Sequence, residues 1–237
     1  MQHIELLQKI GQLANVVPVV RDLRGNLLKD YLKTIQFTPL MAEVLVGIML
    51  GDGTLQRNGG TNCFLKYDQG YANRLVVQLV YLIFEPYVGK PPSIRYKTVN
   101  GERKEHSVWF RTFRFKEFTR YQNLFYALNA LGAVERRVPI NIQELLTPIA
   151  LAFWFMDDGS KDPSGYYLHT QCFTLADVKR LQQALGNKFG LETSVCRDIK
   201  NEKTYYYLYI RAGSMKKFTQ LIDPYIIEPM RYKLHTV

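Results

Sequence analysis

The chain has 237 residues, enough for one large domain or two small ones, with 47% hydrophobic and 22% charged residues. This composition excludes a wholly disordered or collagen-like chain, and its longest apolar stretch, broken by Glu43, is too short for a membrane span. The formal net charge of +10, from 31 Lys and Arg against 21 Asp and Glu, favours nucleic acid as a partner.

The placement of the cysteines and histidines argues against further classes of protein. The three cysteines and four histidines are scattered without metal-ligand spacing, which argues against a disulfide scaffold, structural zinc and histidine-ligated zinc catalysis. The first residues show no basic head, apolar stretch or cleavage site of a secretory signal. We therefore expect the protein to act where it is made, or to reach its compartment through a segment outside this sequence.

The first strongly predicted helix spans residues 40–52 and closes with Asp52 and Gly53. Thr38 is a good N-cap, Pro39 suits the first helical position, and the glycine suits a left-handed turn at the helix end. The region before it, 1–36, is an N-terminal extension that we expect to be helical in part, with Arg21, Arg24, Lys29 and Lys33 available to phosphates but without an assigned role. After the helix, the patterns predict a strand at 63–67, a helix at 71–84, strands at 94–99 and 107–114, and a helix at 116–128.

The second half of the chain repeats this order. A helix at 149–158 follows a second Thr-Pro pair and ends at Asp158-Gly159. It is followed by a predicted strand at 166–173, a helix at 175–189, strands at 193–199 and 204–211, and a helix at 215–222. Arg111, Lys116, Phe118 and Thr119 recur in the same spacing as Arg211, Lys216, Phe218 and Thr219.

We therefore predict an α+β fold of two αββαββα units, each with four strands. The join lies in 132–143, where two arginines and a proline interrupt helix formation. The expected organisation is an extension at 1–36, a first repeat at 37–132, a linker at 133–145 and a second repeat at 146–237.

An aspartate ends both of the repeated helices. A helix C-terminus carries about −0.5 of a charge, so a carboxylate there costs roughly 0.3–1 kcal/mol. If the copies pack about a pseudo-twofold axis, Gly47 and Gly51 let the helices approach, and Asp52 and Asp158 become neighbours that need protons or cations. Hard oxygen ligands without imidazole suit Mg²⁺. Beside a basic surface, this arrangement predicts metal-assisted phosphodiester hydrolysis.

These residues resemble the LAGLIDADG homing endonucleases of the single-chain, two-repeat type, similar to the omega-intron endonuclease group. The resemblance spans 37–234 and rests on the segments 45–53, 146–159, 169–173 and 230–234. It implies that the two pseudo-symmetric repeats form a saddle of antiparallel sheets around a central pair of motif helices. The motif prefers small residues at two positions where the second helix has Phe153 and Asp157, so we expect an asymmetric helix interface, with Phe153 and Trp154 opposite the glycines.

The resemblance also implies roles. Asp52 and Asp158 are the metal-binding acids, and Asp157 is either a helix cap or a supporting acid. Lys233 borders the active site, and its counterpart is either Arg136 or Arg137. Gln171 lies near the attacking water, and the corresponding first-repeat position is Leu65 or Lys66. The candidates are thus Asp52, Asp158, Lys233, Arg136, Arg137 and Gln171 for catalysis, and Gly51, Asp52, Asp157 and Asp158 for Mg²⁺, which Mn²⁺ would replace.

Strand faces supply the expected DNA contacts. Arg95 and Lys97 share one face of their strand by two-residue alternation, and antiparallel ribbons fit the major groove. The loop 99–105 contains Asn-Gly and predicts a hairpin tip. The full set of candidates is Arg57, Lys66, Arg95, Lys97, Arg111, Lys161, Arg197, Lys200, Lys203, Tyr205, Tyr207 and Arg211.

The resulting functional hypothesis is a monomeric endonuclease that cuts double-stranded DNA at a long non-palindromic site, leaving short 3′ overhangs. We expect it to be encoded and active in an organelle, a mitochondrion before a chloroplast, with no membrane partner. Two alternatives remain. One is an RNA maturase that assists splicing of a group I intron, alone or in addition to cleavage. The other is a DNA-binding regulator without catalytic activity.

Overall fold

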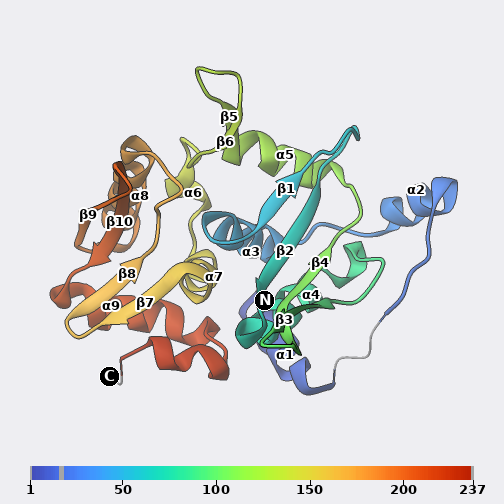
Figure 1. Cartoon of the computed structure of the whole chain (residues 1–237), viewed down its shortest axis with the longest axis horizontal. Coiled ribbons are helices and arrows are strands. Elements are labelled where there is room, and N and C mark those ends of the chain that lie inside the picture. Colours follow the sequence, from blue (N-terminus) through green and yellow to red (C-terminus); the bar gives the residue numbers. More distant parts are fainter. Residues whose placement is uncertain (1, 16–18, 236–237) are drawn as a thin grey trace. The chain divides into compact units, whose positions relative to one another are not determined.

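The computed structural model describes residues 2–15 and 19–235. It consists of two compact units (Figure 1). Unit 1 comprises residues 1–42 and 52–122, and unit 2 comprises residues 43–51 and 123–237. Most of the first motif helix therefore belongs to the unit that is built mainly from the second half of the chain.

Unit 1 is built on a four-stranded antiparallel sheet in the order β1-β2-β4-β3. Its strands are β1 (Thr54–Gln56), β2 (Phe64–Gly70), β3 (Ser93–Val99) and β4 (Glu102–Arg111). Helix α4 (Arg74–Phe84) packs on β2 and β4, and α1 (Gln2–Gly11) packs on α4. The remaining elements are α2 (Gly25–Thr34), most of α5 (Lys116–Phe125), and short 3₁₀ turns at Leu13–Asn15, Tyr71–Asn73 and Glu85–Tyr87.

Aromatic side chains fill the core of unit 1. Phe110 meets Tyr67 and Tyr81 edge to face, with ring centroids 6.2 and 5.9 Å apart. Phe37, just before the first motif helix, packs edge to face on Tyr87 and Phe118 at 6.0 and 5.8 Å. Such pairs add to the burial of large apolar surfaces, so the chain enters the motif helix from a rigid position.

Unit 2 contains a matching sheet in the order β7-β8-β10-β9. Its strands are β7 (Gly159–Asp162), β8 (Gly165–Leu168), β9 (Thr193–Lys200) and β10 (Lys203–Ile210). Helices α8 (Leu175–Phe189) and α9 (Ala212–Ile222) pack on this sheet (Figure 1). The unit also contains a small hairpin of β5 (Tyr126–Leu128) and β6 (Val134–Arg136), the short helix α6 (Ile142–Leu145), and 3₁₀ turns at Asp223–Tyr225 and Glu228–Lys233.

The main hairpins of both units use the same turn. Asn100 and Gly101 join β3 to β4 with φ of 52° and 80°, and Asn201 and Glu202 join β9 to β10 with φ of 51° and 62°. Two residues with positive φ match the strand twist at such turns. The hairpin tip that Asn-Gly predicted in the first repeat is confirmed, and the second repeat forms its turn without glycine.

The motif helices are α3 (Pro39–Leu50) and α7 (Pro148–Asp158). The Thr147 hydroxyl accepts from the Ala150 amide at 3.2 Å, as Thr38 does from Met41 at 3.2 Å, so both predicted N-caps are confirmed. The predicted left-handed ends are wrong. Gly159 has φ −99° and ψ 150°, so α7 passes directly into β7.

The two motif helices touch closely within unit 2. A Cβ on Gly47 would lie 2.4 Å from the Ala150 carbonyl oxygen and 2.8 Å from the Phe153 Cβ. A Cβ on Gly51 would lie 2.5 Å from the Cβ of Asp157. The glycines of α3 thus accept the larger side chains of α7, which confirms the expected asymmetric interface at Phe153.

The αββαββα order is confirmed in both halves, with corrections at several ends. The short strands β1 and β7, directly after the Asp-Gly pairs, were missed. The helix predicted at 116–128 ends at Phe125 and is followed by β5, and the strand predicted at 166–173 ends at Leu168. The expected linker contains β6 and α6. In the part of the chain that the structure describes, no single helix is long and apolar enough to span a membrane, and only the bent pair α2 and α3, at 110°, meets those criteria together.

Candidate active site

A lysine closes the C-terminal end of α7. The Lys233 ammonium donates to the carbonyl oxygens of Phe155, Met156 and Asp157 at 3.5, 2.6 and 3.4 Å. The last carbonyls of a helix have no partner inside the helix and carry its negative partial charge. Lys233 therefore places a positive charge directly beside Asp158, the next residue along the chain.

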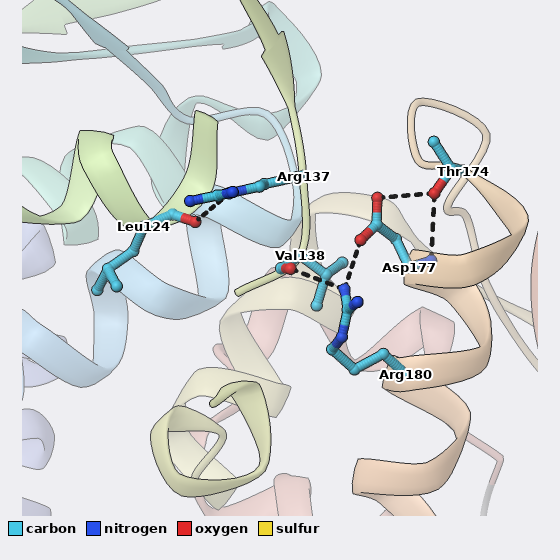
Figure 2. Close-up of polar contacts among 6 residues, drawn as sticks. All are labelled: Leu124, Arg137, Val138, Thr174, Asp177 and Arg180. Atoms are coloured by element: carbon cyan, nitrogen blue, oxygen red, sulfur yellow. Dashed lines mark hydrogen bonds and ion pairs between the residues drawn. The ribbon is translucent and has the colours of Figure 1, made fainter. Parts of the chain in front are cut away.

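An arginine performs the same task for α3. The Arg136 guanidinium donates to the Gly51 carbonyl oxygen at 2.5 Å, across 85 residues of sequence. Arg137 instead donates to the Leu124 carbonyl at 3.2 Å (Figure 2) and to the Asn123 carbonyl at 3.1 Å. Arg136 is thus the counterpart of Lys233. Arg137 does not border the motif helices as expected, because its side chain donates to carbonyls in the last turn of α5.

The segment that follows Arg136 is held by a half-buried ion pair (Figure 2). Arg180 donates to the Val138 carbonyl at 3.0 Å and to the Asp177 carboxylate at 2.6 Å. Asp177, only 7% exposed, also accepts from the Thr174 hydroxyl at 2.9 Å, while its amide donates back to that oxygen at 3.2 Å. This reciprocal cap fixes the start of α8, and through Val138 it fixes the backbone that positions Arg136.

His169 links several side chains around Asp158. Its amide donates to the Asp158 carbonyl at 2.8 Å, and its ring nitrogens lie 3.0 Å from the Ser160 hydroxyl and 3.3 Å from the Gln171 amide. Burial, and then the positive charge of Lys233, lower the pKa of His169. The ring is therefore neutral near pH 7 and holds the exposed Gln171 on the same side of the unit as Asp158.

Asp52 has its own amide partner, which the sequence did not predict. The Gln69 amide donates to the Asp52 carboxylate at 2.8 Å, and Asn73 donates to the Gln69 oxygen at 3.1 Å. Gln69 is 6% exposed, whereas Asp52 is exposed. Of the two positions expected to correspond to Gln171, Leu65 is fully buried and Lys66 lies on the face of β2 opposite to Gln69, so this correspondence stays a prediction. The strand was predicted to end at Tyr67, so Gln69 was not recognised as part of it. Gln69 lies two residues after Tyr67, on the same buried face of β2.

The donor set suits a hard cation only in part. Among residues 2–15 and 19–235, no three His, Cys, Asp or Glu side chains are grouped to hold a metal. Asp157 is 9% exposed and packs on Gly51, whose carbonyl accepts from Arg136. Mg²⁺ usually uses one or two carboxylates and completes its shell with water and substrate phosphates. Asp52, in unit 1, and Asp158, in unit 2, each offer one carboxylate of this kind.

One face of the sheet in unit 1 is basic. Lys66 pairs with Arg111 in the strand register, and Arg95 lies on the same side, over the Trp109 ring at 4.8 Å. Lys97, two residues after Arg95 on β3, lies on this side as well. Asp68 forms ion pairs with Lys66, at 3.3 Å, and with Arg95. Partial burial raises the pKa of Asp68, but the hydrogen bonds from Arg95 and Lys66 hold it below its usual value.

The corresponding face in unit 2 is rich in tyrosine. Tyr167 lies 5.5 Å from Tyr207 and 5.0 Å from Tyr209, between ring centroids. By strand alternation, four other predicted DNA-binding residues lie on this side and two lie on the opposite side. Lys200, Lys203, Tyr205 and Arg211 lie on the tyrosine side, whereas Arg197 and Lys161 pair with Tyr206 and Tyr166 on the helix-facing side. Arg57, the remaining candidate, is exposed in the turn after β1.

Known proteins share this architecture. Residues 42–218 match a sequence model described as the LAGLIDADG DNA endonuclease family. The chain is 31% identical over 221 residues to probable intron-encoded endonuclease 1 of Wickerhamomyces canadensis, covering 89% of this chain and 90% of that protein. It is 30% identical over 200 residues to cytochrome b mRNA maturase bI2 of Saccharomyces cerevisiae, covering 81% of this chain but only 46% of the maturase.

A solved structure is similar over almost the whole chain. The homing endonuclease I-WcaI, bound to its DNA recognition sequence, aligns with a TM-score of 0.77 and 25% identity. The alignment covers 97% of this chain and 98% of that one. The likeness therefore includes both sheets and both motif helices.

Proposed function

Because the chain belongs to the LAGLIDADG DNA endonuclease family, we propose that it is an intron-encoded homing endonuclease. Its substrate is double-stranded DNA, and its reaction is metal-dependent hydrolysis of one phosphodiester bond in each strand. The observation that carries this proposal is the paired end of the motif helices in unit 2. Gly51 and Asp157 are packed together there, and each helix end has a cation on its last carbonyls.

The two aspartates supply the reactive groups in this proposal. Asp52, two residues after α3, and Asp158, the last residue of α7, bind divalent cations, Mg²⁺ with Mn²⁺ as a substitute. A bound divalent ion lowers the pKa of the attacking water and stabilises the departing 3′ oxygen. Lys233 and Arg136 offset the negative helix ends and stabilise the charge that develops on the phosphate. Gln171 and Gln69 orient the acids and the water.

The sheets bind the substrate in this proposal. The basic face of unit 1 and the tyrosine-rich face of unit 2 lie in the two major grooves of one target. The difference between the two faces matches a non-palindromic site, with different contacts in each half. A single chain carries both motif helices, so it acts as a monomer, and the break leaves short 3′ overhangs. The named relatives further support expression from an intron in an organelle, here a mitochondrion.

A cleavage selection tests this function. The purified chain is incubated in Mg²⁺ with a plasmid library carrying candidate intron-insertion sequences, and linearised plasmids are sequenced. We expect one family of long asymmetric sites, cut in both strands, and no cutting in EDTA. A chain that binds the library but never cuts it in Mg²⁺ or Mn²⁺ contradicts the proposal.

A second function has support from relatives that are named as maturases. The chain is 30% identical to a protein named as a cytochrome b mRNA maturase, so we also propose a test for assistance to group I intron splicing. The host intron is transcribed and incubated with the chain at low Mg²⁺, where self-splicing is slow. Faster splicing, retained when Asp158 is changed to Asn, would assign the maturase function separately from cleavage.

A further inference from the structure

A basic groove in unit 1 lies between the N-terminal extension and the sheet. It has a volume of about 790 Å³ and is lined by residues 21–24, the 89–91 loop and strand β4. Phe64 and Trp109 contribute aromatic surface, and Arg24, Lys90 and Arg111 contribute charge. Neither motif helix takes part in this groove.

The outer wall of the groove is firmly attached. Arg21 forms an ion pair with Glu85 at 2.6 Å, and its side chain is only 20% exposed. The same guanidinium donates to the Glu85 carbonyl at 3.1 Å, and the Arg21 amide donates to the Gly89 carbonyl at 2.8 Å. Tyr31 of α2 donates to the Pro86 carbonyl at 2.9 Å. The extension is therefore part of the fold of unit 1, and the groove is preformed.

The charges in the groove are available to a ligand. Arg24 pairs with Asp22 at 3.0 Å, but both side chains are largely exposed, at 85% and 75%, and such pairs contribute little. Lys90 and Arg111 are exposed and form no ion pair with any residue that the structure describes. Asp22 is the one acidic residue among the described residues that line the groove. This imbalance selects an anionic ligand.

The groove continues the proposed DNA surface. Arg111 lines the groove and is also paired with Lys66 on the basic face of the sheet. A polymer with regularly spaced negative charges, lying on that face, would meet Arg24 and Lys90 at its edge. The backbone of duplex DNA has this spacing of charge. Contacts to it add affinity without reading the sequence.

We propose that this groove holds the DNA backbone beyond the edge of the sheet, with Arg24 and Lys90 contacting phosphates. This inference rests on the proposed function, because it extends the same DNA surface. It gives the N-terminal extension a role: the extension lengthens the bound DNA segment on the side of unit 1.

The test compares two double variants. R24A/K90A removes two of the groove's cations and keeps Arg111. K179A/K216A removes two exposed lysines on α8 and α9, helices that cover the helix-facing side of the other sheet. Both variants change the net charge equally. Binding to a mixed-sequence 40-bp duplex is measured from 50 to 200 mM salt, and thermal unfolding confirms that both variants are folded.

Loss of two phosphate contacts lowers the slope of log K against log salt by about 1.8. We expect this decrease for R24A/K90A and none for K179A/K216A. If the wild type shows a steep salt dependence and R24A/K90A has the same slope, the groove does not hold the DNA backbone, but the proposed function is unaffected. No binding of duplex by the wild type would instead overturn the function itself. If R24A/K90A weakens binding of single-stranded RNA but not of duplex DNA, the groove is an RNA site and the inference is wrong.

Discussion

The packing of the two motif helices can be tested with one added methyl group. Gly47→Ala places a Cβ 2.4 Å from the Ala150 carbonyl oxygen and 2.8 Å from the Phe153 Cβ. Both obstacles belong to the backbone or its first side-chain atom, so neither can swing aside. The helices must separate by about 1 Å to restore ordinary contact distances.

The expected cost follows from two opposing effects. Overpacking of a core costs about 1–3 kcal/mol, and alanine gains about 1 kcal/mol over glycine in a helix. Because the clash involves rigid atoms, we take the upper part of the first range and expect a net destabilisation of about 2 kcal/mol. For a chain of this size, the midpoint of thermal unfolding then falls by roughly 4–8 °C.

A second glycine provides the matched control. Gly186 also lies within a helix, but a Cβ there would meet only the Leu191 carbonyl oxygen, at 3.9 Å. Gly186→Ala therefore keeps the helical gain without the clash, and the midpoint should rise by about 2–4 °C. If Gly47→Ala is as stable as Gly186→Ala in differential scanning calorimetry, the close approach of α3 and α7 is wrong.

Three further predictions concern single side chains. Asp158→Asn should abolish double-strand cleavage while duplex binding stays within about tenfold, measured by plasmid cutting and a binding titration; undiminished cutting in Mg²⁺ would remove Asp158 from catalysis. The lowered pKa of His169 means that the unfolded chain binds this proton more readily, so stability is full above about pH 6.5 and falls as the pH decreases below it. His169→Gln should flatten that part of a denaturant-midpoint curve, and an unchanged curve would show that other groups cause the acid sensitivity. Arg180→Met leaves a buried Asp177 oxygen and the Val138 carbonyl without their donor, so we expect a loss of about 1.5–3 kcal/mol in urea unfolding; a loss below 0.5 kcal/mol, the usual effect of a surface substitution, would contradict the bracing role of this pair.

Much of the architecture was predictable because local signals agreed with the tertiary fold. Helix α8 was predicted with its observed ends, since Thr174 caps its start and Gly190, at φ 59°, ends it. The motif helices carry Thr-Pro at the start and a nearly continuous apolar sequence, as expected for helices buried on all sides. Repetition of the whole order of elements then identified the two halves.

Local signals failed where distant groups decide the structure. Helix α5 was predicted to continue to Leu128, but Arg137 takes the carbonyls of its last turn and the chain turns into β5. The Asn129 side chain then accepts from the amides of Leu131 and Ala133, which closes the β5–β6 hairpin inside the expected linker. No pattern within residues 116–136 shows that a later arginine will end the helix.

The same limit applies to the candidate site. A signature in the sequence identifies the acid at a helix end, because the acid is local to the helix. The groups that set the charge around it are not local: Lys233 reaches α7 across 76–78 residues, and Arg136 reaches α3 across 85. Such a partner needs a positive charge and a side chain long enough to reach the helix end, but no fixed spacing along the chain. An arginine therefore caps one motif helix and a lysine caps the other. We therefore expect Arg136→Lys to retain more cleavage than Arg136→Met, because the shorter ammonium still supplies the charge that the Gly51 carbonyl requires. Equal loss of cutting in both variants would show that the two-pronged guanidinium geometry, and not its charge, is what the site uses.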